Sequence, residues 1–204
     1  MKPSQVSPEV EDPVKGRILG YARERFFAVG FRSITMEEIA TSLGLSKKTL
    51  YVHFATKNEL VEAVLMAKAG RVRACLDKIL AESTPVEEKM ATVLEAIQEE
   101  TAEVKAPFLH DLRRYAPEVF EHFRTFRAAT IPGYFSRIME EGQRAGRVRK
   151  DLKPALILTL LMSSIEGILN PDSLLRLKST PREGIETILK IVFEGILIRP
   201  DSLT

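Results

Sequence analysis

The chain has 204 residues, 45% of them hydrophobic, with 30 basic and 28 acidic residues and a formal net charge of +2. This composition excludes an intrinsically disordered chain and allows a large core in one long domain or two small ones. The single cysteine, Cys75, excludes an internal disulfide framework and indicates a reducing, cytoplasmic environment. The longest apolar run, residues 155–169, contains a glutamate and is shorter than the roughly 20 residues of a membrane span, so we expect no membrane segment.

The chain begins with a segment that contains three prolines and three acidic residues. Residues 1–13 lack the apolar core of a secretory signal, so we expect a flexible leader. Residues 14–29 are predicted to form the first helix, and Gly30 to end it. The buried stripe of that helix is expected to consist of apolar residues at helical spacing: Ile18, Ala22, Phe26 and Val29.

Residues 35–54 carry the most specific pattern of the chain. Thr35 is suited to cap a helix, and Glu38 three residues later completes a capping box. Gly44 then ends that helix, because a residue without a Cβ atom adopts the left-handed backbone of a tight turn at low cost. Two short helices joined in this way, with the small Ala40 at their crossing, are typical of a helix-turn-helix.

The second short helix is predicted to run from Lys47 to about Val52, with Ser46 as its cap. Leu50 points back to the first helix, which leaves a polar outer face formed by Lys47, Lys48, Thr49 and Tyr51. Lysines at a helix start oppose the helix dipole, and a bound phosphate or guanine edge would explain their presence. We therefore expect this helix to enter a DNA major groove; a solvated helix start with two lysines is the alternative.

A second capping box, Thr56 with Glu59, predicts a long helix that starts near Lys57. Side chains at this start could reach the DNA backbone and position the protein without reading sequence. For His53, a packed or solvent-exposed imidazole is the alternative. Residues 14–60 carry eight basic and four acidic residues, which favours phosphate binding. The predicted DNA-binding residues are Thr35, Ser46, Lys47, Lys48, Thr49, Tyr51, His53 and Lys57.

Two further patterns of the same kind predict helix starts in the remainder of the chain. Thr84 with Glu87 and Thr180 with Glu183 each enclose a proline at the first helical position. No stretch alternates between apolar and polar residues with a period of two, so no strand is predicted. The sequence therefore predicts an all-α fold, with an N-terminal three-helix helix-turn-helix domain followed by a larger helical bundle.

Residues 108–135 contain seven of the fourteen phenylalanine and tyrosine residues. Pro117 is predicted to start a helix, and Pro132 with Gly133 to kink or break it. A kinked helix lined by aromatic rings can form a ligand cavity, and ordinary core packing is the alternative. The candidate pocket residues are Phe108, His110, Tyr115, Phe120, Phe123, Phe126, Arg127 and Tyr134, with Arg113 and His122 as further polar candidates.

Catalysis and metal binding find little support in the sequence. Glu118 and His122 are one helical turn apart, but two ligands are too few for a closed metal site. The sequence has no nucleophile elbow, phosphate loop or glycine-rich dinucleotide motif. We therefore expect no enzyme activity, no cofactor and no bound metal.

The last two predicted helices are strongly apolar. Residues 154–169 are apolar on nearly all sides, and residues 181–198 carry a continuous apolar face. A terminal helix has little left to pack against in its own chain, so we expect a four-helix interface between two copies. Docking on its own core is the alternative. The predicted interface residues are Leu160, Ser164, Ile168, Ile185, Leu189, Val192, Phe193 and Ile196.

Residues 17–65 resemble the N-terminal domain of the tetracycline-repressor (TetR) family. The resemblance is carried by Phe31-x-x-Ile34-Thr35, Ile39-Ala40, Leu43-Gly44-Leu45-Ser46, Thr49-Leu50-Tyr51, His53-Phe54 and Lys57-x-x-Leu60. It implies a homodimeric repressor that leaves a palindromic operator when a small effector binds. Lys48 and Val52 depart from the residues common in the family, which bears on base preference rather than on fold.

The resemblance also implies a division into a DNA-binding domain, residues 14–60, and an effector-binding and dimerisation domain, residues 61–204. The expected partners are double-stranded DNA, a second copy of the chain and an unidentified small effector, apolar or aromatic in view of residues 108–135. Two other functions stay open. One is a constitutive or architectural DNA-binding protein without an effector, and the other is a ligand-binding or enzymatic helical protein that carries a helix-turn-helix.

Overall fold

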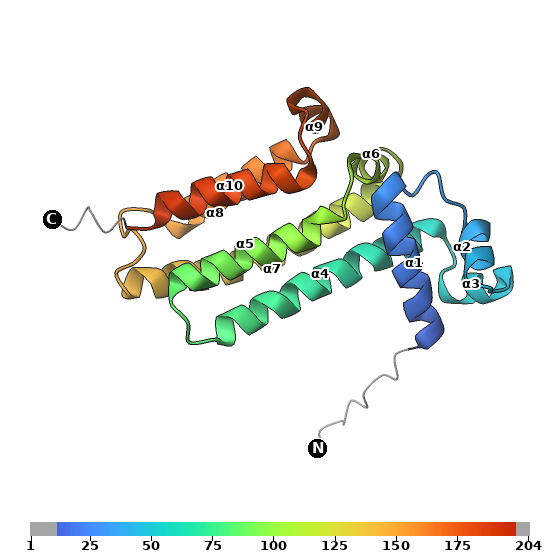
Figure 1. The fold of residues 1–204 in the computed structure, drawn as a ribbon, viewed down its shortest axis with the longest axis horizontal. Coiled ribbons are helices and arrows are strands. Elements are labelled where there is room, and N and C mark those ends of the chain that lie inside the picture. Colours follow the sequence, from blue (N-terminus) through green and yellow to red (C-terminus); the bar gives the residue numbers. More distant parts are fainter. Residues whose placement is uncertain (1–11, 199–204) are drawn as a thin grey trace, which may run out of the picture.

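The computed structural model describes residues 12–198, which form ten α-helices (Figure 1). The only pairing of extended backbone in this part of the chain is a single antiparallel bridge between Val148 and Leu197. The predicted all-α fold is confirmed. Most of the predicted leader, residues 1–11, lies outside the described residues, and Asp12 and Pro13 belong to the first helix as its N-cap and first residue.

The helices form a small unit at one end of a long bundle (Figure 1). Three short or medium helices and the start of a long fourth one make the small unit: α1 (Pro13–Val29), α2 (Met36–Ser42), α3 (Lys47–His53) and α4 (Lys57–Ala81). The remaining helices are α5 (Val86–Ala102), α6 (Ala106–Tyr115), α7 (Pro117–Arg144), α8 (Pro154–Ile168), α9 (Pro171–Leu177) and α10 (Pro181–Ile196). In the bundle, α4, α5 and α7 pack against one another, and α10 packs on α5 and α8.

Three of the four predicted capping boxes are present, and they start α2, α4 and α10. The prediction for Thr84 and Glu87 is wrong. Pro85 is extended and is itself the N-cap, so α5 begins at Val86, one residue later than the pattern requires. The carboxylate of Glu87 forms an ion pair with Arg147 instead of returning to the helix start.

The buried side chains form two separate hydrophobic clusters. The first cluster joins α1, α2 and α3 to the start of α4, to α6 and to the start of α7. The second cluster joins the rest of α4 to α5, α7, α8 and α10. Along α4 the first cluster ends at Leu65 and the second begins at Val72. The small N-terminal unit and the long bundle therefore have distinct cores, and two continuous helices, α4 and α7, contribute to both.

Helix α6 is part of the core of the N-terminal unit. The ring centroid of Phe108 lies 4.7 Å from that of Phe27 and 6.3 Å from that of Phe31, both in edge-on geometry. Phe27 is therefore buried, whereas Val29, which was predicted to be buried, is 43% exposed at the end of α1. Residues 14–60 alone do not close this core, because Phe108 from α6 completes it.

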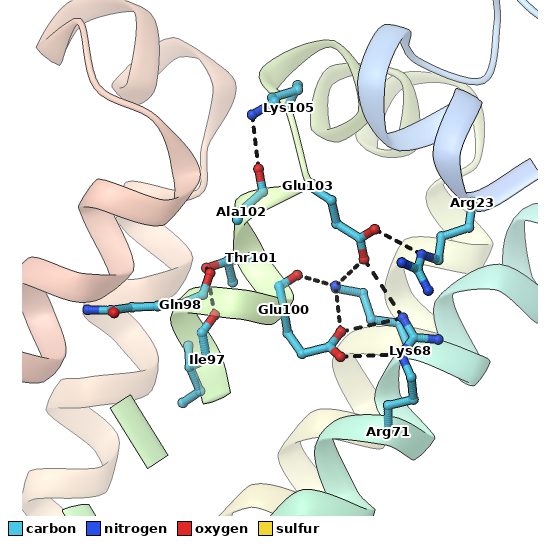
Figure 2. A network of polar contacts seen from close by, with 10 residues as sticks. All are labelled: Arg23, Lys68, Arg71, Ile97, Gln98, Glu100, Thr101, Ala102, Glu103 and Lys105. Atoms are coloured by element: carbon cyan, nitrogen blue, oxygen red, sulfur yellow. Dashed lines mark hydrogen bonds and ion pairs between the residues drawn. The ribbon is translucent and has the colours of Figure 1, made fainter. Parts of the chain in front are cut away.

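A network of charged side chains joins α1, α4 and the end of α5 between the two clusters (Figure 2). The ammonium group of Lys68 lies 2.9 Å from a carboxylate oxygen of Glu100 and 2.9 Å from one of Glu103. Arg23 of α1 donates to the other oxygen of Glu103 at 2.9 Å, and Arg71 of α4 pairs with Glu100. Burial opposes the charged form of Glu100, but hydrogen bonds from Lys68 and Arg71 lower its pKa.

Helix α7 runs without a break from Pro117 to Arg144, with Pro132 inside it. Of the predicted kink or break at Pro132 and Gly133, the break is therefore wrong. A proline within a helix removes one backbone hydrogen bond, and the packing of the following turns can offset that loss. Here Phe135, Ile138 and Met139 follow directly and are buried in the second cluster.

Helix α10 docks on the core of its own chain. Ile185, Leu189, Val192 and Ile196 are all at most 8% exposed, because α5 and α8 cover them. This corrects the prediction that these four side chains face a second copy. Gly184 permits the close approach of α8, since a Cβ atom there would lie 2.1 Å from Cγ2 of Ile168. The large aliphatic side chains left open on these two helices are Leu156, Leu160 and Ile191.

Within residues 12–198, no single helix is both long and apolar enough to cross a membrane. Helices α8 and α9 reach the required length and hydropathy only when taken together, across a bend of 76°.

Replacing Gly30 with alanine is expected to destabilise the protein by about 1–3 kcal/mol. Gly30 has a φ of 85°, and a Cβ atom there would lie 2.5 Å from Oδ2 of Asp111. Gly20→Ala is the matched control, because Gly20 is helical with nothing within 4 Å of the added atom, and should be neutral or stabilising by up to about 1 kcal/mol. Urea denaturation measures both; equal effects of the two substitutions would contradict the packing described for Gly30.

Candidate nucleic-acid interface

The turn between α2 and α3 has the geometry of a helix-turn-helix. Gly44 has a φ of 65°, and the backbone N–H of Leu45 donates to the carbonyl of Ala40 at 2.8 Å. Leu50 is fully buried in the first cluster. Ser46 caps α3 by accepting a hydrogen bond from the Thr49 N–H at 3.0 Å. The predicted turn, cap and inward leucine are therefore all confirmed, and α3 is held with one fixed face outward.

The outward face of α3 differs in one residue from the predicted face. Lys47, Lys48 and Tyr51 are exposed, and Val52 is 74% exposed. Thr49 is half-buried, and its hydroxyl lies 2.8 Å from that of Ser46. Its hydroxyl is thus engaged within the protein. From the sequence alone, Val52 is only a departure from the residues common in the TetR family. Its position two residues after the buried Leu50, on the opposite side of the helix, indicates that it lies on the outer face.

The two lysines at the start of α3 have different surroundings. Lys47 forms an ion pair with Glu37 of α2, in which both side chains are more than 60% exposed. The acidic partner explains how a lysine is tolerated at this position without a bound phosphate. For Lys48, the structure places no ion pair within residues 12–198. Lys48 is therefore the cation of α3 that is available to an external ligand without breaking an existing contact.

The residues around α3 are fixed by local hydrogen bonds. Thr35 caps α2 and its hydroxyl accepts from the Glu38 N–H at 3.1 Å. In return, the Thr35 N–H donates to the Glu38 carboxylate at 2.6 Å; this bond, together with a hydrogen bond from the Thr35 side chain, lowers the pKa of the Glu38 carboxyl. His53 lies at the end of α3, with Nδ1 3.3 Å from Oδ2 of Asp12. The imidazole is thus placed beside the start of α1, a contact that sequence reasoning missed because Asp12 was assigned to the leader.

Lys57 lies at the start of α4, close to the loop between α1 and α2. Burial and the nearby positive charge of Arg32 lower the pKa of Lys57, and the charges of Asp111 and Glu38 partly offset this. Its ammonium group lies 5.9 Å from the ring centroid of Phe31. Lys57 is therefore half-buried, but it adds positive charge next to α3.

Helix α1 braces the turn between α2 and α3. The guanidinium of Arg17 donates to the carbonyl of Leu43 at 2.9 Å, and the hydroxyl of Tyr21 lies 2.9 Å from that of Ser42. These contacts fix α3 relative to the rest of the N-terminal unit. Nothing in the local sequence pattern predicts them, because the partners are more than twenty residues apart.

The residues predicted to line an effector pocket do not lie together. Phe108 is in the first cluster, and Phe120 and Phe123 pack against that cluster. His110 and Tyr115 are exposed on α6, and the guanidinium of Arg32 lies 4.4 Å from the Tyr115 ring centroid.

Three of the predicted pocket residues lie on the middle of α7. The Tyr134 hydroxyl donates to Asp77 of α4 at 2.5 Å, while Phe126 and Arg127 are half-buried. Of the further polar candidates, Arg113 lies over the ring of Phe120, and His122 pairs with Glu62 of α4.

Two shallow surface depressions, of about 520 and 470 Å³, lie away from these residues. The first is lined by Pro85, Val86, Glu87, Glu88, Ala145 and Arg147, and the second by Glu140, Gln143, Arg144 and Lys150. Neither is lined by a residue predicted to contact an effector. Within residues 12–198, no three histidine, cysteine, aspartate or glutamate side chains come together as a metal site.

The comparisons with known proteins place the helix-turn-helix in a family. Residues 18–64 match the family described as bacterial regulatory proteins, tetR family. The uncharacterized HTH-type transcriptional regulator YvaF of Bacillus subtilis is 27% identical over 165 residues, covering 80% of this chain and 86% of YvaF. The HTH-type transcriptional repressor DhaR of Mycobacterium sp. strain GP1 is 24% identical over 203 residues, covering 94% of this chain and 96% of DhaR. The fatty acid degradation regulator FadR from Bacillus halodurans has a similar fold, with a TM-score of 0.70, 16% identity, and coverage of 92% of this chain and 98% of that one.

Replacing Ser46 with alanine is expected to lower the free energy of unfolding by about 1 kcal/mol, because α3 loses its N-cap acceptor. The exchange of the Thr49 amide hydrogen should accelerate, since that N–H donates to Ser46. Ser46→Asp supplies an acceptor again and should restore stability. Hydrogen exchange and urea denaturation measure these effects; unchanged protection of Thr49 in Ser46→Ala would show that the cap is dispensable.

Proposed function

We propose that this transcriptional regulator of the tetR family acts as a repressor, which holds an operator as a homodimer and releases it when a small effector binds. The observation that supports DNA reading most directly is the exposed face of α3, with Lys48, Tyr51 and Val52 pointing away from the core. A lysine there can donate to a guanine edge, and the valine methyl groups can contact a thymine methyl. The name of the relative DhaR supports the assignment as a repressor.

The surrounding polar groups would position α3 on the DNA backbone. Thr35, Ser46, Tyr51, His53 and Lys57 all lie on α3 or at the starts of α2, α3 and α4. The hydroxyls of Thr35 and Ser46 accept hydrogen bonds as helix caps, so the hydroxyl hydrogens are the groups that could donate to a phosphate oxygen. Contacts of this kind set the register of a helix in the groove and leave base selection to the outer face of α3.

A dimer is proposed through the open sides of α8 and α10. Leu156 and Leu160 of α8 are 65% and 57% exposed, and Ile191 of α10 is 67% exposed. Exposed large aliphatic side chains on two helices that already pack together are suited to bury a second copy. In such a dimer, two α3 helices about 34 Å apart would enter successive major grooves of a two-fold operator.

Release by an effector would act through two helices that contribute to the first cluster, α4 and α6. Helix α4 runs from the start of the first cluster into the second, and α6 is packed inside the first. A ligand that moves either helix changes the position of α3 in each protomer, and so the spacing in the dimer. To move a regulator almost completely off its operator, the ligand must favour the released state by about 5 kcal/mol.

A constitutive DNA-binding protein without an effector is the second candidate. The observation that favours it is that the two surface depressions lie away from the aromatic stretch. Fluorescence anisotropy with DNA flanking the coding region, against random DNA, tests operator binding. Adding small molecules to the preformed complex then separates the two candidates.

Replacing Lys48 with alanine is expected to lower operator affinity by about tenfold and to relax preference at one base pair, because one base-edge contact is lost. Lys57→Ala should weaken operator and random DNA alike and reduce the salt dependence of binding, since it removes a backbone contact. Anisotropy titrations on operator variants over a salt series measure both. Equal loss on all sequences for Lys48→Ala would argue against base reading by that residue.

Replacing Leu160 with glutamate is expected to convert the dimer to monomers, because a charge would be placed in the proposed interface. The side chain is 57% exposed in the single chain, so the fold should be retained. Val29→Glu makes the same type of change at a site 43% exposed on α1 and should leave the dimer intact. Sedimentation velocity measures the mass; a Leu160→Glu dimer as stable as the original would place the interface elsewhere.

A further inference from the structure

The two hydrophobic clusters are separated by a layer of polar residues across the bundle. Residues 66–71 of α4, 98–102 of α5 with the following Glu103, and 124–130 of α7 contribute to neither cluster. We call this layer the polar belt. Its cations include Lys68 on α4, which is buried, and Arg127 on α7, which is half-buried. Lys68 has carboxylate partners, whereas Arg127 has no hydrogen-bond or ion-pair partner within residues 12–198.

Lys68 is fully compensated. Two carboxylates, those of Glu100 and Glu103, each lie 2.9 Å from its ammonium group, and the backbone carbonyl of Glu100 also accepts from it (Figure 2). Its side chain is only 10% exposed. A buried cation is tolerated when charged and polar partners replace water in this way. Lys68 therefore needs no external ligand.

Arg127 has no such compensation. Within residues 12–198, the structure gives it neither a hydrogen bond nor an ion pair. Its guanidinium carbon lies 5.9 Å from the ring centroid of Phe123, in a cation–π contact. Desolvation lowers the pKa of Arg127, and the more distant charge of Glu166 only partly offsets that. A half-buried guanidinium without a protein acceptor keeps its donors open to a ligand, and a planar donor of this kind suits a carboxylate.

We propose that Arg127 binds the carboxylate of an amphipathic effector whose apolar part lies along the aromatic residues of α7. Phe123, one turn before Arg127, and Phe126, directly before it, are both half-buried, and the Arg127 guanidinium lies over the Phe123 ring. The polar belt lacks the dense apolar packing of the clusters, so side chains there can separate to admit a ligand at lower cost. This inference rests on the proposed function, because it names the chemical class of the effector that the regulator would sense.

The test compares carboxylates with neutral molecules of the same shape. The probes are a series of straight-chain fatty acids and phenyl-substituted alkanoic acids, each paired with its primary amide. Thermal unfolding and isothermal titration calorimetry measure binding. The acids that bind should do so about 10- to 100-fold more tightly than their amides, as a charge-assisted contact requires.

Arg127→Gln should abolish the preference for the acid over the amide. It should also leave the ligand-free protein as stable as the original or raise its melting temperature, because an uncompensated cation is removed. Arg127→Lys keeps the charge and should retain part of the preference. Arg124→Gln is the matched control, because Arg124 lies one turn earlier, is exposed and pairs with Glu121; it should leave acid binding unchanged.

The proposal is overturned if no acid in the series binds, if acid and amide bind equally, or if Arg127→Gln keeps the preference. A large loss of stability in ligand-free Arg127→Gln would also overturn it, since that result would assign Arg127 a structural role. Operator binding is measured on the same preparations. Specific operator binding without acid binding refutes this inference alone, whereas acid binding without specific operator binding refutes the proposed function and leaves the Arg127 site standing.

Discussion

The packing of Phe108 against Phe27 and Phe31 is the contact on which the architecture depends. Aromatic rings bury large apolar areas, and edge-on pairs add to that burial. Because Phe108 comes from α6, the N-terminal unit has no complete core without the bundle. Asp111, one turn later on α6, accepts a hydrogen bond from the Arg32 N–H at 2.8 Å. Its carboxylate also lies so close to Gly30 that a Cβ atom there would not fit. A displacement of α6 must therefore move the helix-turn-helix or disrupt its core.

The polar belt is the layer in which a shift of the two cores relative to each other would disturb the fewest buried apolar contacts. Hydrophobic clusters are closely packed and resist gradual deformation, so movement concentrates where packing is less dense. The network around Lys68 spans this layer and ties α1 to α4 and α5 through Arg23 and Glu103. The ion pairs of this network are also hydrogen bonds, which require a particular geometry, so the network favours one arrangement of the three helices. A change elsewhere in the layer would act against that preference, so under the proposed function the belt is where a ligand would be coupled to α3.

Sequence patterns predicted well what local chemistry controls. Thr35, Gly44, Ser46 and Leu50 define caps, a turn and an inward contact within sixteen residues, and all four predictions are confirmed. The errors arose where distant segments meet. The apolar face of α10 was read as open because the partner helix α5 lies about ninety residues earlier in the chain. Likewise, Phe108 was predicted to line a pocket because the sequence around it does not show that it packs against Phe27 and Phe31, about eighty residues earlier.

The ion pair between Lys47 and Glu37 would limit non-specific binding in the proposed DNA interface. An exposed pair of this kind contributes at most about 1 kcal/mol, so DNA can break it at small cost. Until then Glu37 neutralises one of the two cations at the start of α3. Non-specific affinity grows with each cation that meets a phosphate, whereas specific affinity depends on groups that reach base edges. In the proposed interface, one paired and one available lysine would keep general attraction low and leave Lys48 for discrimination.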